Sequence, residues 1–197
     1  KKEGRKLILL MPGSRLMEIE KMLPTLLEAA KIIQKQLPEV DFVMPRAGTI
    51  PLNLLEEKIQ ASGLDVRITE GHNYDLFSVA DLALATSGTV TLEAALCGLG
   101  SVIVYRTNPL TYMIAKLVVN IPHIGLPNIV AGRSVVPELI QNDFTPAKVA
   151  KAAMELLESE RNALMKKDLE YVKERLGKPG AVGRVAELVL KIAGEKR

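Results

Sequence analysis

Aromatic side chains are scarce in this 197-residue chain: they make up 4% of it, and tryptophan is absent. Since 48% of the residues are nevertheless hydrophobic, the core has to be built from Leu, Ile, Val, Ala and Met. Such cores are typical of parallel sheets that are covered by helices, and less so of β-sandwiches. The composition therefore favours an α/β fold with one sizeable core.

Three further shortages exclude other classes of protein. One cysteine, Cys97, excludes an internal disulfide framework and predicts a reducing compartment such as the cytosol. The net charge is only +3 and the basic residues are spread along the chain, so we expect small anions rather than nucleic acid as ligands. The first apolar run stops at Pro12 and Gly13. We therefore expect no signal peptide and no membrane span, and any membrane contact is predicted to be peripheral.

Short apolar runs alternate with segments whose apolar residues recur at helical spacing. Strands are predicted at residues 6–11, 41–44, 66–69, 81–85 and 101–105, and helices at 19–37, 52–61, 74–80 and 89–97. Alternation of this kind predicts right-handed βαβ crossovers and a doubly wound parallel sheet with helices on both faces. Ligands of such sheets bind beyond the carboxyl ends of the strands.

The pattern is less regular after residue 105. It predicts an amphipathic helix at 109–120, an irregular segment at 123–133, helices that begin near 136, 146 and 162, and a separate apolar-faced helix at 182–193. The apolar stripe of 109–120 has two interpretations, which are packing in the core and contact with acyl chains. Core packing is the commoner outcome for that spacing.

The segment TSGTVTLE at residues 86–93 joins a predicted strand to a predicted helix. Gly88 lies between two hydroxyl residues, Ser87 and Thr89, in a turn that lets N–H groups and hydroxyls point at an anion. The N-terminus of the helix adds partial positive charge. This turn is a candidate diphosphate site, although ordinary N-capping by Ser87 or Thr89 would explain the same residues.

Glu93 is the only charged residue between Asp81 and Arg106, in a span whose composition predicts burial. A buried carboxylate needs a partner. A capping box does not supply one, because the residue three positions earlier is Val90, which has no hydroxyl. Glu93 shares a helix face with Thr89, so it is placed to accept hydrogen bonds from ribose hydroxyls one turn below a phosphate. A structural ion pair is the alternative.

A second loop, PGSR at residues 12–15, follows the first predicted strand. It places the Ser14 hydroxyl, free N–H groups and the Arg15 guanidinium at the same edge of the sheet. A guanidinium suits a phosphate. Pairing of Arg15 with Glu18 or Glu20 on the following helix is an equally good explanation that needs no ligand.

Five segments carry a resemblance to a known family. In chain order they are LLMPGSR…EI, SGTVTLEAAL, VYRTNPLTY, IAKLVV and LPNIVAGR…PELIQ, all between residues 7 and 144. In that order they resemble the lipid-A-disaccharide synthase family. The later segments carry the assignment, because a Glu in a helix after a glycine turn is found in many related glycosyltransferases.

The resemblance implies a GT-B fold, in which two Rossmann-like halves face a cleft, and this chain is similar to the C-terminal half. Residues 1–160 would form the UDP-sugar-binding domain, and residues 161–197 would form helices that pack on the N-terminal half or on a partner subunit. The family transfers 2,3-diacylglucosamine from UDP to 2,3-diacylglucosamine 1-phosphate with inversion and release of UDP. The resemblance implies no metal and no cofactor, peripheral attachment to the cytoplasmic face of a Gram-negative inner membrane, and a possible homodimer.

Roles for individual residues follow from the resemblance as well. Glu93 would hold the ribose, and Arg15 would stabilise the developing phosphate charge. Asn128 and Arg133 would contact phosphate or donor sugar, although an Asn after Pro127 is as readily a turn former. The remaining predicted donor-binding residues are Ser14, Gly71, His72, Ser87, Gly88, Thr89, Val90 and Thr91.

The general base is expected to lie in the N-terminal half. His72 and His123 are the conceivable bases in this chain, but a lone loop histidine is more often structural. Without the other half the chain is expected to be inactive. Two alternatives remain open, which are another UDP-sugar GT-B enzyme (a transferase or a 2-epimerase) and a stand-alone nucleotide-binding domain.

Overall fold

A computed structural model describes residues 4–108, 122–178 and 180–194. Its centre is one parallel sheet with the strand order β3-β2-β1-β4-β5-β6. The strands are β1 (Lys6–Met11), β2 (Val40–Arg46), β3 (Val66–Glu70), β4 (Leu82–Thr86), β5 (Ser101–Tyr105) and β6 (Glu138–Ile140). The order reverses between β1 and β4, which is the topological switch point of a doubly wound sheet. The predicted fold class is confirmed.

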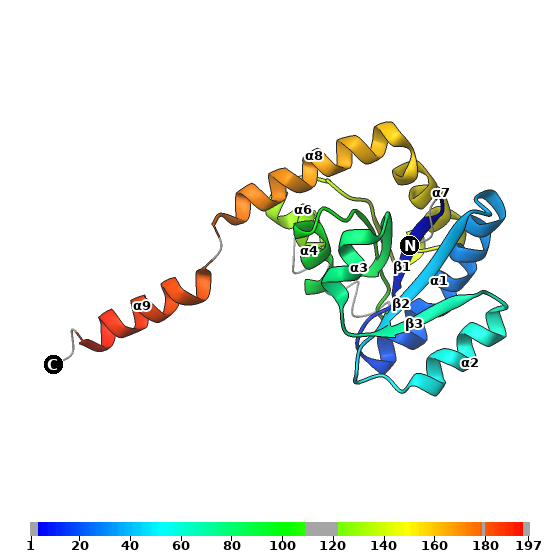
Figure 1. Ribbon diagram of the computed structural model, residues 1–197, viewed down its shortest axis with the longest axis horizontal. Coiled ribbons are helices and arrows are strands. Elements are labelled where there is room, and N and C mark those ends of the chain that lie inside the picture. Colours follow the sequence, from blue (N-terminus) through cyan, green and yellow to red (C-terminus); the bar gives the residue numbers. More distant parts are fainter. Residues whose placement is uncertain (1–3, 109–121, 179, 195–197) are drawn as a thin grey trace.

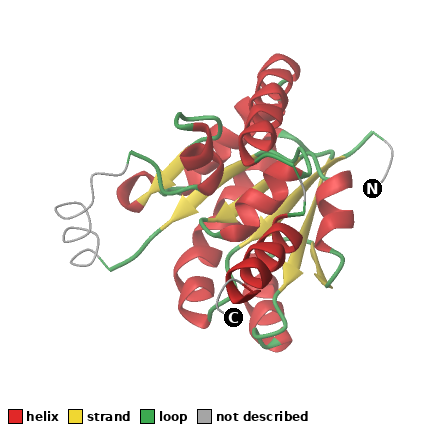
Figure 2. Ribbon diagram, turned by 90° about the vertical axis from the view of Figure 1, so that its left-hand side faces the viewer, coloured by secondary structure: helices red, strands yellow, loops and turns green. Residues whose placement is uncertain are grey.

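Helices cover both faces of this sheet (Figure 2). The described helices are α1 (Leu16–Gln36), α2 (Leu52–Ser62), α3 (Asn73–Val79), α4 (Thr89–Leu96), α6 (Leu126–Ala131), α7 (Pro146–Leu157), α8 (Ser159–Leu176) and α9 (Ala181–Gly194), with a 3-10 turn η1 (Gln141–Asp143). All but α9 pack around the sheet. The helices predicted at 19–37, 52–61, 74–80 and 89–97 are therefore present, with ends that differ by a few residues.

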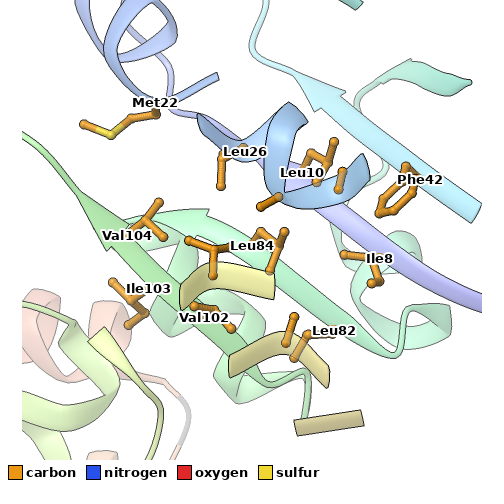
Figure 3. Close-up of a cluster of buried hydrophobic side chains, with 14 of the residues drawn as sticks. Ile8, Leu10, Met22, Leu26, Phe42, Leu82, Leu84, Val102, Ile103 and Val104 are labelled. Atoms are coloured by element: carbon orange, nitrogen blue, oxygen red, sulfur yellow. The ribbon is translucent and has the colours of Figure 1, made fainter. Parts of the chain in front are cut away.

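Strand β1 divides the core into two layers because its successive side chains point to opposite faces. Ile8 and Leu10 join the larger cluster, which includes the buried face of α1, and Figure 3 shows Leu10 near Leu26 of that helix. Leu7 and Leu9 join a smaller cluster with α3 and α4. A strand that is apolar on both faces has to be buried on both, which is why β1 reads as a continuous apolar run.

Helix boundaries follow the local sequence. Pro24 lies inside α1 without ending it, and α1 stops at Gln36, two residues before Pro38. Gly63 closes α2 in a left-handed conformation with φ of 72°. That conformation costs a glycine little, so Gly63 is a suitable helix terminator.

Two sequence predictions were wrong in the region after residue 121. The segment 123–133, predicted to be irregular, contains α6, because Pro127 lies in the first turn, where its missing N–H group costs no hydrogen bond. The helix predicted from about residue 136 is instead β6, which pairs with β5 from Ile103↔Glu138 to Tyr105↔Ile140. The helix predicted at 109–120 lies outside the described residues.

The last two helices differ in burial. Helix α8 packs against α4, α6 and α7 through buried Met165, Leu169 and Val172. Helix α9, in contrast, has no buried residue and extends away from the sheet (Figure 1). Its apolar side chains, among them Val182 and Val185, are therefore exposed. The separate unit predicted for residues 161–197 stays a prediction. No described helix is both long and apolar enough to cross a membrane.

Candidate functional site

A cavity of about 470 Å³ lies at the carboxyl edge of the sheet, next to the switch point between β1 and β4. The loops after β1 and β4, the end of β2 and the first turns of α3 and α4 form its walls. Its lining residues are Met11, Gly13, Ser14, Arg15, Glu18, Pro45, Arg46, Ala47, Asn73, Thr86, Ser87, Gly88, Thr89, Val90 and Glu93. Both loops that the sequence singles out therefore face one space of the size that small-molecule ligands occupy.

The turn between β4 and α4 is held by residues that the sequence analysis assigned to the ligand. The Ser87 N–H donates to the Val104 carbonyl at 3.0 Å, and the Ser87 hydroxyl donates to the Ile124 carbonyl at 3.0 Å. Thr91 is fully buried and donates its hydroxyl back to the Gly88 carbonyl at 2.7 Å. Ser87 and Thr91 thus shape the turn, and their donors are already engaged within the protein.

The remaining donors of this turn are open. Among the described residues, no hydrogen bond engages the N–H groups of Gly88, Thr89 and Val90 or the Thr89 hydroxyl. No side chain caps α4 either, so N-capping by Ser87 or Thr89 does not explain the turn. Unpaired N–H groups at a helix N-terminus attract an anion.

Glu93 lies one turn below Thr89, is half-buried and lines the same cavity. Within the described ranges, no hydrogen bond or ion pair engages its carboxylate, so the predicted alternative of a structural ion pair is not found there. A half-buried carboxylate of this kind is suited to accept hydrogen bonds from the hydroxyls of a ligand.

The loop after β1 differs from this turn because its donors are occupied. The Glu18 carboxylate accepts hydrogen bonds from the N–H groups of Ser14 at 2.8 Å and Arg15 at 3.2 Å, and it pairs with the Arg15 guanidinium at 2.8 Å. The pairing with Glu18 that the sequence left open is therefore present. Arg15 still lines the cavity, with its side chain 80% exposed.

Three polar residues of the cavity lining were given no role by the sequence analysis. Arg46, at the end of β2, pairs with Glu70 and donates to the Ile50 carbonyl. Thr86 ends β4, and its buried hydroxyl has no partner among the described residues. Asn73 opens α3. The rule that ligands bind beyond the carboxyl ends of parallel strands would have indicated Arg46 and Thr86.

Gly71 and His72, which the sequence analysis assigned to donor binding, precede Asn73 of the cavity lining but do not line the cavity themselves. His72 has a left-handed φ of 56° before α3, and its exposed ring lies 3.3 Å from the Asp75 carboxylate. Gly71 also has positive φ. The other histidine, His123, faces the Glu138 carboxylate at 3.7 Å, away from the cavity lining.

Asn128 is fully buried, and its amide is surrounded by hydrogen-bond partners from the protein. Its oxygen accepts from the N–H groups of Val135 and Val136, and its nitrogen donates to the Val136 carbonyl and to Glu138. Glu138 in turn accepts from the N–H groups of residues 124 and 125. Asn128 does not line the cavity. It lies inside α6 and not in a turn, and its contacts favour a structural role over a ligand contact.

Arg133 also lies outside the cavity lining. It donates to Asp168 of α8 at 2.5 Å, and its guanidinium lies 5.4 Å from the centre of the Tyr171 ring. The hydrogen bond to Asp168 raises the pKa of the Arg133 guanidinium. These contacts join the end of α6 to α8, which leaves the predicted donor contact of Arg133 without direct support in this conformation.

A larger hollow of about 650 Å³ lies at the edge of the sheet between β3 and α2. Its cation, Arg46, is paired with Glu70, and the hollow lies along the side of the edge strand instead of beyond the switch point. The smaller cavity, with open N–H groups and an unpaired carboxylate, is the better candidate for a functional site.

The fold is shared with solved structures of a 2-epimerase and of a glycosyltransferase. The UDP-GlcNAc 2-epimerase from Neisseria meningitidis, bound to UDP-GlcNAc, matches with a TM-score of 0.61 and 18% identity over 96% of this chain and 45% of the other. The glycosyltransferase WaaG, involved in lipopolysaccharide biosynthesis, matches with a TM-score of 0.59 and 19% identity. The match covers 87% of this chain and 44% of WaaG. At such identities the likeness shows the fold alone, which is an α/β Rossmann-like fold.

Sequence comparison then gives the family. The family model described as lipid-A-disaccharide synthetase matches residues 2–192, so this chain belongs to that family. The lipid-A-disaccharide synthase of Geobacter sulfurreducens is 41% identical over 194 residues, which is 98% of this chain and 50% of the relative. The lipid-A-disaccharide synthase of Trichlorobacter lovleyi is 43% identical over 95% of this chain and 49% of the relative. The chain thus spans about half the length of the curated relatives it matches.

The buried contacts of Asn128 predict a structural effect of its removal. The change Asn128→Ala leaves two N–H groups and one carbonyl unpaired, and should lower the free energy of unfolding by about 2–4 kcal/mol. Urea unfolding measures this loss. The exposed Asn53→Ala is the control, with an expected change within about 0.5 kcal/mol. Equal stability of the two variants would contradict the structural role.

The reactivity of the Cys97 thiol tests where the Glu93 carboxylate lies. Burial raises the pKa of the Cys97 thiol, the Glu93 carboxylate raises it further, and Lys173 lowers it. Because the thiolate is the reactive form, Glu93→Gln should lower the pKa and speed the reaction of Cys97 with iodoacetamide at pH 8. Glu57→Gln, an exposed change on α2, should leave the rate unchanged. An unchanged rate in Glu93→Gln would place the carboxylate away from the thiol.

Proposed function

We propose that this chain is the donor-binding half of a lipid-A-disaccharide synthase. The whole enzyme would transfer 2,3-diacylglucosamine from UDP to 2,3-diacylglucosamine 1-phosphate and release UDP. Membership of the family supports this proposal, as does the coverage of about half of each relative. The observation that carries it is the pairing, in one cavity, of open N–H groups at residues 88–90 with the unpaired Glu93 carboxylate.

In the proposed complex the diphosphate rests on the N-terminus of α4. The N–H groups of Gly88, Thr89 and Val90 and the Thr89 hydroxyl donate to its oxygens, and the helix dipole adds to the attraction. One turn below, Glu93 accepts hydrogen bonds from the ribose hydroxyls. Bonds to an ionised carboxylate are stronger than bonds between neutral groups, so Glu93 should contribute strongly to nucleoside affinity.

The transfer needs stabilisation of the departing UDP and a base for the acceptor hydroxyl. The first task suits the α4 turn together with Arg15, whose exposed guanidinium lies across the cavity. For the second, His72 and His123 do not line the cavity. We therefore assign the base to the N-terminal half, propose that the anomeric configuration inverts, and propose that this chain alone is inactive. UDP-sugar is the substrate, and the proposal includes neither a metal nor a cofactor.

The proposed partners follow from the same reading. The exposed apolar residues of α9, among them Val182, Val185 and Leu188, suit packing on the N-terminal half or on a second subunit in a homodimer. We propose that the enzyme acts in the cytoplasm as a peripheral protein of the inner membrane, where its acylated substrates lie. The alternative of a 2-epimerase rests on fold likeness alone, whereas the family match favours the synthase.

Titration calorimetry with UDP tests the proposed site. The chain should bind UDP, and Glu93→Gln should raise the dissociation constant by about tenfold or more, because hydrogen bonds to a charged acceptor are lost. Glu57→Gln, with its exposed side chain, should bind like the parent. If the folded parent does not bind UDP, the proposed function is wrong. Equal binding by Glu93→Gln would instead remove only the role of Glu93.

A further inference from the structure

The Glu18 carboxylate occupies the donors that the α1 loop would otherwise offer to a ligand. One of its oxygens accepts from the N–H groups of Ser14 and Arg15, and the other accepts from the Arg15 guanidinium. The Glu18 side chain is only 18% exposed, and Glu18 lines the cavity. An anionic group of the protein therefore lies where an outside anion would meet this loop.

Gly13 makes this close approach possible. Its φ of +120° is a conformation that side chains rarely adopt, and a Cβ at this position would lie 2.6 Å from the Cβ of Glu18 and closer still to its Oε2. Any other residue would push the carboxylate off the loop. The loop is thus shaped around the Glu18 side chain.

The two helix N-termini that border the cavity therefore differ. At α4 the N–H groups of residues 88–90 are open, whereas in the loop before α1 the N–H groups of Ser14 and Arg15 are filled by Glu18. On the α1 side the cavity is lined by Ser14 and by Arg15, whose guanidinium has five donors and uses part of them on Glu18. A diphosphate on α4 would draw Arg15 away from Glu18 and would also lie near the Glu18 charge.

We propose that Glu18 is an internal anion that competes with the donor diphosphate for Arg15. The inference rests on the proposed binding of UDP. Because the Glu18 carboxylate neutralises the Arg15 guanidinium, Arg15 contributes less to the affinity for the nucleotide in the ground state. As charge develops on the leaving phosphate, Arg15 can turn toward it, so the interaction grows in the transition state, where it accelerates the reaction. Glu18 also limits how tightly the product UDP is held.

The variant Glu18→Gln tests this proposal by a gain of binding. Gln at the third helical position can still accept the hydrogen bond from the Arg15 N–H group but carries no charge, so the variant should fold. Calorimetry at low salt should show UDP binding about threefold to tenfold tighter than in the parent, and binding of uridine unchanged. Simple structural damage would weaken binding and cannot produce this gain.

Two further variants separate the mechanism from a general charge effect. Glu20→Gln removes the same charge from an exposed position two residues away, and should leave UDP affinity unchanged. In an Arg15→Ala background, Glu18→Gln should give a much smaller gain, because the competition acts through Arg15. A double-mutant cycle measures the difference.

The outcomes are distinct. UDP binding by Glu18→Gln that is equal to or weaker than that of the parent overturns the inference and leaves the proposed function standing. An equal gain with uridine, with Glu20→Gln or without Arg15 overturns it as well. A folded parent that does not bind UDP contradicts the proposed function, and the inference falls with it.

Discussion

The open N–H groups at the start of α4 depend on hydrogen bonds made by their neighbours in the chain. Ser87 is tied to the Val104 and Ile124 carbonyls, and Thr91 is tied back to the carbonyl of Gly88. With both ends of the turn held by the protein, the N–H groups of residues 88–90 stay without partners at the cavity. N–H groups at a helix N-terminus that the protein does not satisfy attract an anion.

The charges around the cavity are arranged in two ways. Arg15 is paired with Glu18, and Arg46 with Glu70, so these cations are balanced before any ligand arrives. Glu93, in contrast, has no partner within the described residues, and neither do the donors at α4. The site thus combines unpaired groups, which favour initial binding, with paired groups, which can change partner as charge moves. This combination suits a reaction whose leaving group is a diphosphate.

The sequence predicts the elements whose signals are local. The buried strands are continuous apolar runs, and Gly88 after such a run indicates the turn that borders the cavity. Strand β6 was missed because it has three residues at the sheet edge, and its place depends on pairing with β5. The roles of Ser87 and Asn128 depend on contacts in the folded chain, the first with Ile124, 37 positions away. Residue type alone indicates that such groups form hydrogen bonds but not with which partner.

Amide proton exchange, measured by NMR with and without UDP, tests the central claim most directly because it resolves single N–H groups. The account predicts that UDP slows exchange and shifts the signals at Gly88, Thr89 and Val90. The Ser87 amide, which is already bonded to Val104, should change much less. UDP binding that leaves residues 88–90 unchanged and perturbs another surface, such as the surroundings of Asn128, would contradict the account.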